Sequence, residues 1–194
     1  MNIGDFLAGI DTTDLLVVLF LFAMFILGFV QGTIRRLLGI GGMVFSFLLA
    51  ANVKEPLGDF LGANWTQFPP EYAEMIGFLT VFVAALVAFT LTIQGTYHKT
   101  ALFEKYTFVD EVIGGFLGVV QAMLLLIFLK VILDSYFLLP FPVDPQEIEF
   151  LRTSWTLLHE SGTGDLLNGT IIPRLLAIGG LLVPESIKAL YPRA

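Results

Sequence analysis

Four long apolar runs constrain this chain more than any other feature of its sequence. They extend over residues 15–30, 37–53, 75–93 and 112–133. A helix needs about 20 apolar residues to cross roughly 30 Å of hydrocarbon, and each run lies close to that length. Lys130 is the only charged residue inside any of them. The pattern predicts an all-α polytopic membrane protein with four transmembrane helices.

The composition agrees with a bilayer environment and argues against several classes of function. Only 14% of the 194 residues are charged, against roughly a quarter in soluble domains, and the net charge is −7. Because nucleic-acid binding needs clustered Lys and Arg, we expect no such partner. The chain has no Cys, two His and no Gly-x-Ser-x-Gly motif. We therefore expect no enzyme, no metal site and no cofactor.

The short loops predict the orientation of the chain. Segments 31–36 and 94–111 together hold four Lys and Arg residues, whereas the opposite side holds Lys54 alone before the tail. Because short basic loops stay in the cytoplasm, we expect both termini outside it, in the plasma (inner) membrane of a bacterium. The "QGTIRR" connection suits a helix hairpin that turns near Gly32.

Two segments outside the apolar runs are typical of short amphipathic helices on the membrane surface. They are "KEPLGDFLGA" (54–63) and "TALFEKY" (100–106), which carry apolar residues at helical spacing. The chain thus divides into a four-helix transmembrane domain, 1–134, and a helical C-terminal tail on the outer face, 135–194.

The tail shows the start signals of a helix. Asp144 suits an N-cap, Pro145 the first helical position and Glu147 the third, which predicts a helix to about His159.

An apolar segment, 165–183, follows that helix and has Arg174 near its middle. A central Arg costs about 2.5–3.5 kcal/mol on insertion into hydrocarbon. We therefore expect the segment at the interface or packed on the bundle, not as a fifth span.

A stripe of small and polar residues follows one face of the fourth run. Its members are Asp110, Gly114, Gly118 and Gln121, which share a side at 100° per residue. Gly28 and Gly32, with Gln31 beside them, repeat the spacing at the end of the first run. Small residues four apart let another helix approach closely. The stripe predicts a helix-packing seam or, alternatively, a polar site for an ion or substrate.

Three cations near the ends of the runs have simpler interpretations. Lys130 lies four residues before Asp134, near the outer end, and is expected to extend its ammonium group to the interface. Arg35 and Arg36 are expected to fix the topology, and contact with phospholipid headgroups is compatible with that role.

Two stretches resemble the colicin V production protein family, "GFVQGTIRRLL" and "DEVIGGFLGVVQAMLLLIFLKVILD". The positions that match the family pattern are Gly32, Arg35, Asp110, Gly114 and Gly118. Gln31 and Gln121 stand where the family usually has Arg. The resemblance covers about residues 14–134 and implies a four-span bacterial inner-membrane protein that supports toxin production or export, or envelope homeostasis.

Two hypotheses of function remain open on the sequence. The first is a non-catalytic protein that binds membrane or periplasmic partner proteins, or a second copy of itself. The alternative is a small membrane transporter or channel, which would be expected to hold ionisable groups inside the membrane.

Overall fold

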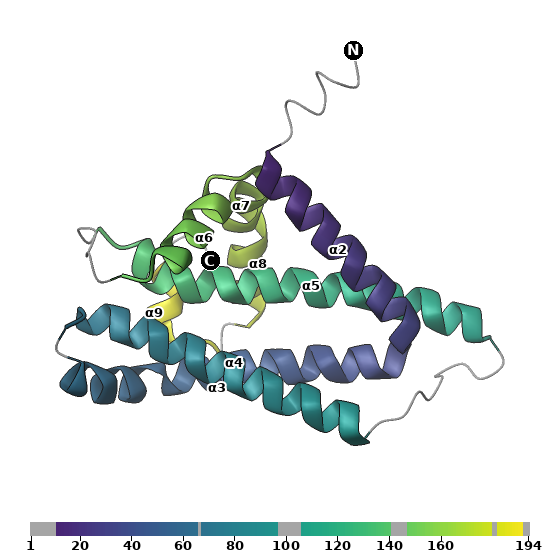
Figure 1. Ribbon diagram of the computed structural model, residues 1–194, viewed down its shortest axis with the longest axis horizontal. Helices are drawn as coiled ribbons and strands as arrows, with labels where there is room; N and C mark the ends of the chain where they lie inside the picture. Colours follow the sequence, from purple (N-terminus) through teal and green to yellow (C-terminus); the bar gives the residue numbers. More distant parts are fainter. Residues whose placement is uncertain (1–10, 66, 97–105, 141–146, 180–181, 192–194) are drawn as a thin grey trace, which may run out of the picture.

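The computed structural model describes residues 11–65, 67–96, 106–140, 147–179 and 182–191. The described chain is helical and contains no strand (Figure 1). Four helices are long and apolar enough to cross a membrane: α2 (Thr12–Gln31), α3 (Thr33–Asn64), α4 (Pro70–Thr96) and α5 (Thr107–Phe137). The predicted all-α membrane fold is confirmed, and each helix contains one predicted run.

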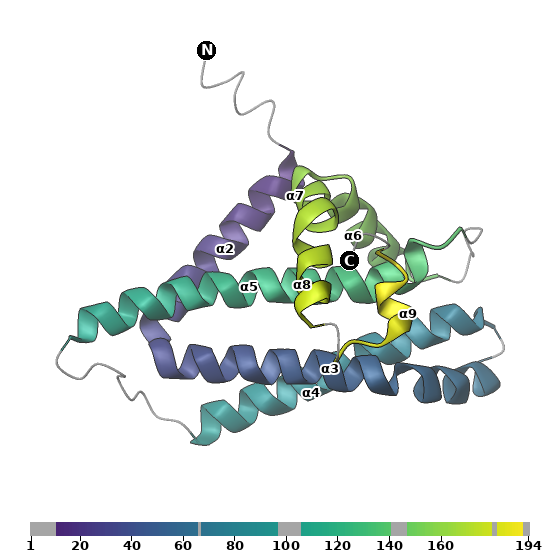
Figure 2. The ribbon, with the colours of Figure 1, turned by 180° about the vertical axis from the view of Figure 1, so that it is seen from behind.

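The four long helices form two packed pairs. α3 and α4 lie side by side along most of their length, and α5 runs beside them (Figures 1 and 2). α2 leans across α5 at a steep angle and makes most of its contacts there. The connection of α2 to α3 and the start of α5 lie at one end of the molecule. The predicted hairpin is thus present, but its first helix, α2, packs mainly against α5 and not against α3.

The turn between α2 and α3 occupies a single residue. Gly32 has φ +78°, a left-handed conformation that side chains disfavour, and its N–H donates to the Gly28 carbonyl at 2.9 Å. A Cβ atom at Gly32 would also lie 2.7 Å from Asp110 Oδ2. The prediction of a turn near Gly32 is confirmed.

The "KEPLGDFLGA" segment is the last part of α3 and not a separate surface helix. Lys54 pairs with Glu74 of α4 at 2.6 Å, and Gly58 lies against the backbone of Glu74. These contacts extend the α3–α4 pair beyond its apolar part, which explains why the expectation of an independent helix is wrong. Residues 100–105 of "TALFEKY" lie outside the described residues.

Aromatic side chains fill the space between α3, α4 and α5. Phe47 stacks on Phe128 with ring centroids 4.2 Å apart, and Phe78 and Phe82 of α4 pack against Phe47. All four are buried. Contacts among such rings stabilise the bundle beyond the apolar area they bury.

The tail is a series of short helices folded back over α5. They are α6 (Glu149–His159), α7 (Gly162–Leu166), a π-helical turn (Leu167–Ile171), α8 (Ile172–Ile178) and α9 (Glu185–Lys188). α6 ends at His159 as predicted, but its N-cap is Ile148, so the placement of Glu147 at the third position is wrong. The predicted Asp144 and Pro145 positions lie outside the described residues.

The apolar tail segment packs on the bundle. α7, the π-helical turn and α8 run across α5 (Figure 2), and Leu167, Ile172 and Leu176 enter the core. Arg174 points away from that contact and is exposed. The position of this segment relative to the bilayer stays a prediction.

Candidate functional site

The small residues of the predicted stripe lie where α5 meets α2. A Cβ atom at Gly114 would lie 2.6 Å from the Gly28 carbonyl oxygen, and one at Gly118 would approach the Met24 carbonyl oxygen even more closely. Real Cβ contacts are not that short, so these positions require glycine. The close approach lets the two backbones form the seam that small-xxx-small spacing favours.

Asp110, at the start of the stripe, is bound to the first residue of α3. The Thr33 N–H donates to Asp110 Oδ2 at 3.4 Å, and the Thr33 hydroxyl donates to the Asp110 carbonyl oxygen at 2.9 Å. The first N–H groups of a helix lack partners within that helix. Asp110, on α5, therefore supplies an acceptor for the first N–H group of α3 and completes the turn around Gly32.

Gln121, at the other end of the stripe, faces α3. Arg36 Nη1 donates to Gln121 Oε1 at 2.7 Å, and Gly39 leaves room for the amide, because a Cβ there would lie 3.0 Å from Gln121 Nε2. Arg36 is only 5% exposed, and its Nε has no hydrogen-bond partner among the described residues. The sequence predicts Arg36 to fix the topology, with phospholipid headgroup contact compatible, and gives no sign of its hydrogen bond to Gln121.

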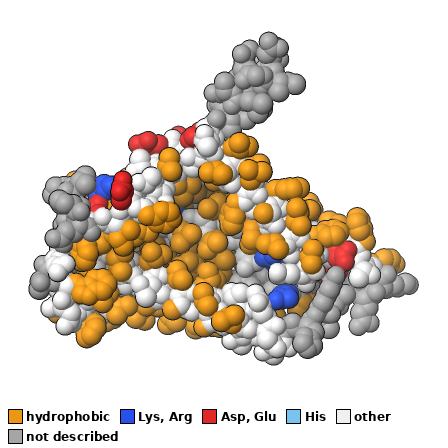
Figure 3. All heavy atoms as spheres, in the orientation of Figure 1, with side chains coloured by type: hydrophobic (Ala, Val, Ile, Leu, Met, Phe, Trp, Pro, Cys, Tyr) orange, Lys and Arg blue, Asp and Glu red, His pale blue; other side chains and the backbone are white. Residues whose placement is uncertain are grey.

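A cavity of about 210 Å³ opens beside this pair, which we call the Arg36 cavity. Every membrane-spanning helix contributes to it. Its lining residues are Met24, Leu27, Gln31, Arg35, Arg36, Gly39, Thr90, Ile93, Gln94 and Gln121. Figure 3 shows Lys and Arg side chains at a hollow between α2 and the α3–α4 pair. The structure thus joins three predicted site residues, Gln31, Arg35 and Gln121, in one place.

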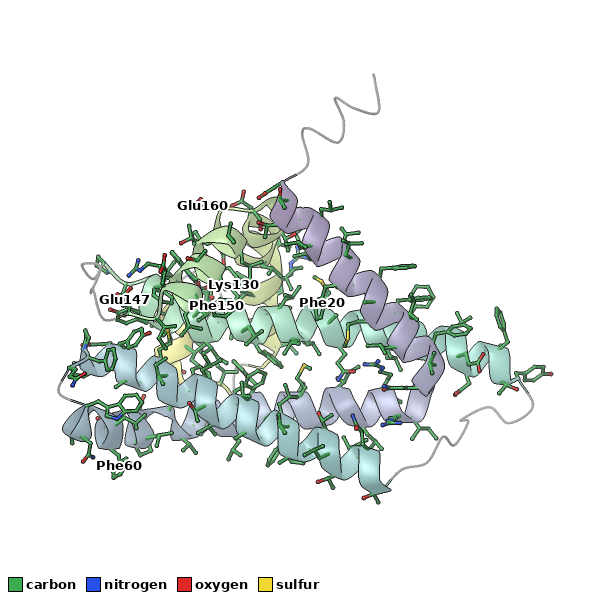
Figure 4. The ribbon with its side chains drawn as sticks, in the orientation of Figure 1. Phe20, Phe60, Lys130, Glu147, Phe150 and Glu160 are labelled. Carbon is green, nitrogen blue, oxygen red and sulfur yellow. The ribbon has the colours of Figure 1, made fainter. Side chains whose placement is uncertain are left out.

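A second polar centre lies near the other end of α5. Lys130 Nζ donates to both carboxylate oxygens of Asp134, at 3.0 and 3.1 Å, and lies 3.3 Å from His159 Nδ1. The side chains of Lys130 and Asp134 are 1% and 0% exposed. The expectation that Lys130 reaches the interface is wrong, because the tail covers this part of α5 (Figure 4).

Asp134 joins three parts of the chain. Besides the Lys130 ammonium, it accepts from the Trp155 indole N–H at 2.7 Å and from the Tyr191 hydroxyl. Burial, reinforced by the negative charge of Asp134, raises the pKa of Tyr191, so the phenol stays protonated and donates. One carboxylate thereby ties α6 and the segment after α9 to α5.

Two further links fix the tail to the bundle. The Ile148 N–H donates to the Tyr72 hydroxyl at 2.9 Å, which attaches the start of α6 to α4. The N–H and hydroxyl of Thr163 both donate to Asp14 Oδ1, at 2.9 and 2.7 Å, which attaches α7 to α2. The i, i+4 spacing of Lys130 and Asp134 could have indicated their pairing, but no local pattern points to Trp155 or Tyr191.

Comparison with protein families shows which family this chain belongs to. A family model described as Colicin V production protein matches residues 13–162, which include the glycine seam and the Lys130–Asp134 pair. The chain belongs to this family. Membership in the colicin V production family supports a role in colicin V production. Comparisons with curated proteins and with solved structures found no match. The family match ends before α8, α9 and Tyr191.

Proposed function

We propose that this colicin V production family member is a non-catalytic protein of the bacterial plasma (inner) membrane that acts by binding partner proteins. In that role it would support toxin production or export, or envelope homeostasis. The observation that carries the proposal is the attachment of the tail to α2, α4 and α5 by partly buried hydrogen bonds. A tail held in this way presents a surface of fixed shape, which favours specific binding.

The outer side of α6 supplies the contact surface in this proposal. Phe150 and Leu157 are 74% and 54% exposed and lie seven residues apart, so they share one face of the helix. Trp155 on the opposite side binds Asp134. Exposed aromatic and aliphatic side chains on an ordered element are typical of protein-binding surfaces.

Site-specific photo-crosslinking in living cells tests the proposal. A photoreactive residue at Phe150 or Leu157 is expected to form one adduct of defined mass, identified by mass spectrometry as a named protein or a second copy of this chain. The matched control is Phe60, which is 65% exposed at the far end of α3. Adducts at Phe60 alone, or with lipid alone at all three positions, would contradict the proposal.

A small transporter or channel is the second candidate function. The Arg36 cavity favours it, because all four long helices line a polar space that holds a buried cation. A flux assay with the purified protein in liposomes separates the candidates. Specific crosslinked partners without flux support the first function, and flux that depends on Arg36 supports the second.

We further propose that both termini face away from the cytoplasm. The α2–α3 turn and the beginning of α5 lie at the same end of the molecule (Figure 1), and Arg35 and Arg36 lie at that turn. This clustering supports a cytoplasmic location for that end. Labelling of single cysteines by an impermeant maleimide tests this orientation.

A further inference from the structure

We propose that the Arg36 cavity binds a phosphate-type oxyanion. The inference concerns a ligand of the protein and stands apart from its protein partners. It is carried by the charge of the cavity lining, by the hydrogen bonding of Arg36 and by the number of donors that converge there.

The described residues of the lining carry positive charge and no negative charge. Arg35 and Arg36 contribute two guanidinium groups, and the remaining polar side chains are amides and one hydroxyl, from Gln31, Thr90, Gln94 and Gln121. The stripe contains one carboxylate, that of Asp110. It is bound to Thr33 at the α2–α3 turn and does not line the cavity. Among the described lining residues, an anion meets only donors, neutral groups and apolar side chains.

Arg36 is incompletely satisfied by the described protein atoms. Its side chain is almost fully buried. Among the described residues, its acceptor is the neutral amide oxygen of Gln121, and its Nε has no partner. Burying a cation is unfavourable unless it is paired and its donors are bonded. The Lys130 ammonium shows the contrast, since it lies on the Asp134 carboxylate. An anion in the cavity would supply Arg36 with the counter-charge that the neutral Gln121 amide does not.

The arrangement of donors fits an oxyanion with several acceptor atoms. They come from all four long helices, so they approach a ligand from several directions. Guanidinium groups bind phosphate through paired N–H donors, which gives both strength and orientation. A volume of about 210 Å³ exceeds the roughly 30 Å³ that one water molecule occupies in the liquid. The phosphate could belong to a lipid headgroup or be soluble, and both present the same chemistry to Arg36.

Binding measurements on the purified full-length protein test the proposal. Isothermal titration calorimetry in neutral detergent uses inorganic phosphate as the probe. Native mass spectrometry compares phosphatidylglycerol with phosphatidylcholine at equal concentration. Preferential retention of phosphatidylglycerol indicates selection for an accessible anionic headgroup.

In whichever assay the wild-type protein binds, Arg36→Gln should weaken binding about tenfold or more, because a charge-assisted hydrogen bond is lost. Arg174→Gln removes the same charge from an exposed position on α8 and should leave binding unchanged.

The outcomes separate the two sources and can overturn the proposal. Phosphate binding that Arg36→Gln weakens about tenfold or more identifies a soluble oxyanion, and selective phosphatidylglycerol binding weakened to that extent identifies a lipid headgroup. Arg35→Gln, at a half-buried position of the same lining, provides the decisive variant should Arg36→Gln fail to fold. Absence of binding to both probes overturns the proposal. Equal weakening by Arg174→Gln and the cavity variants also overturns it, because general charge would then explain the effect.

Discussion

At the scale of single residues, the protein handles two buried cations in different ways. Lys130 has a carboxylate one turn away, and that carboxylate accepts two further hydrogen bonds from the tail. Arg36 has a neutral amide partner and a donor without one among the described residues. The first arrangement stabilises the fold, whereas the second is the one on which the proposed oxyanion site rests.

The first prediction concerns the satisfied pair. Asp134→Asn leaves the Lys130 ammonium buried without a counter-charge and should lower the free energy of unfolding by about 3–5 kcal/mol. Heat or denaturant unfolding in detergent, followed by Trp fluorescence, measures the loss. Glu185→Gln removes an acid that is 88% exposed and pairs with Lys188 at 2.7 Å, so it should change stability by less than about 1 kcal/mol. Equal stability of the two variants would argue against the pair as an anchor.

The second prediction concerns Tyr191. Because its folded-state pKa lies above the ordinary value near 10, the phenol should remain protonated where exposed tyrosines ionise. Its contribution to stability is present below about pH 10 and is lost as the pH rises through the folded-state pKa. Tyr191→Phe should therefore leave the tyrosinate absorbance of the folded protein at pH 10–11 unchanged. It should also lower stability by about 1–3 kcal/mol, through the lost hydrogen bond to a charged acceptor.

At the scale of elements, the pairing of α2 with α5 depends on the absence of side chains. The Gly28 and Gly114 backbones approach to a distance at which a Cβ atom would collide with a carbonyl oxygen. The backbone atoms cannot move aside as a side chain could. The contact is therefore sensitive to one methyl group, unlike the surrounding apolar packing.

The third prediction tests this sensitivity with one substitution at two sites. Gly118→Ala should force α2 away from α5 and cost about 1–3 kcal/mol, as overpacking does. Gly41→Ala, where a Cβ atom has nothing within 4 Å, should be neutral or stabilising by up to about 1 kcal/mol, through better helix propensity. Thermal unfolding in detergent compares them. A Gly118→Ala protein as stable as Gly41→Ala would contradict a tight seam.

The sequence allowed the long helices and the glycine stripe to be predicted because both depend on local composition and spacing. Apolar runs define spans by length, and glycines four apart share a face by helical geometry. The extension of α3 could not be found in this way, since it depends on Lys54 meeting Glu74 from another helix. The Asp134 carboxylate likewise accepts from donors 21 and 57 residues away, and no local pattern records them.

At the scale of the whole molecule, the two ends of the bundle differ in what covers them. The tail encloses the end of α5 that holds Asp134, and α7 reaches the start of α2 through Thr163 and Asp14 (Figure 1). The Arg36 cavity lies toward the opposite end, next to the α2–α3 turn. The tail therefore stabilises one end and leaves the polar cavity uncovered by α6 to α9.

The fourth prediction tests the proposed orientation. Single cysteines at Trp65 and Glu160, both exposed, should react with an impermeant maleimide in intact spheroplasts, whereas one at the exposed Tyr106 should react only after lysis. The chain has no native Cys, so no background labelling from it arises. Labelling of Tyr106→Cys alone in intact cells would invert the topology.

The bond between Asp14 and Thr163 also has a consequence for biosynthesis, since 149 residues separate its partners. At a synthesis rate of about 5–20 residues per second, α2 emerges roughly 7–30 s before the tail segment that holds its outer end. Its other main partner, α5, also follows late in the chain. Until α5 is made, α2 lacks most of its eventual helix contacts and must lie largely against lipid. Only 6% of its most apolar 18-residue stretch is buried inside the finished protein. Most of the α2 surface is therefore already suited to contact with lipid.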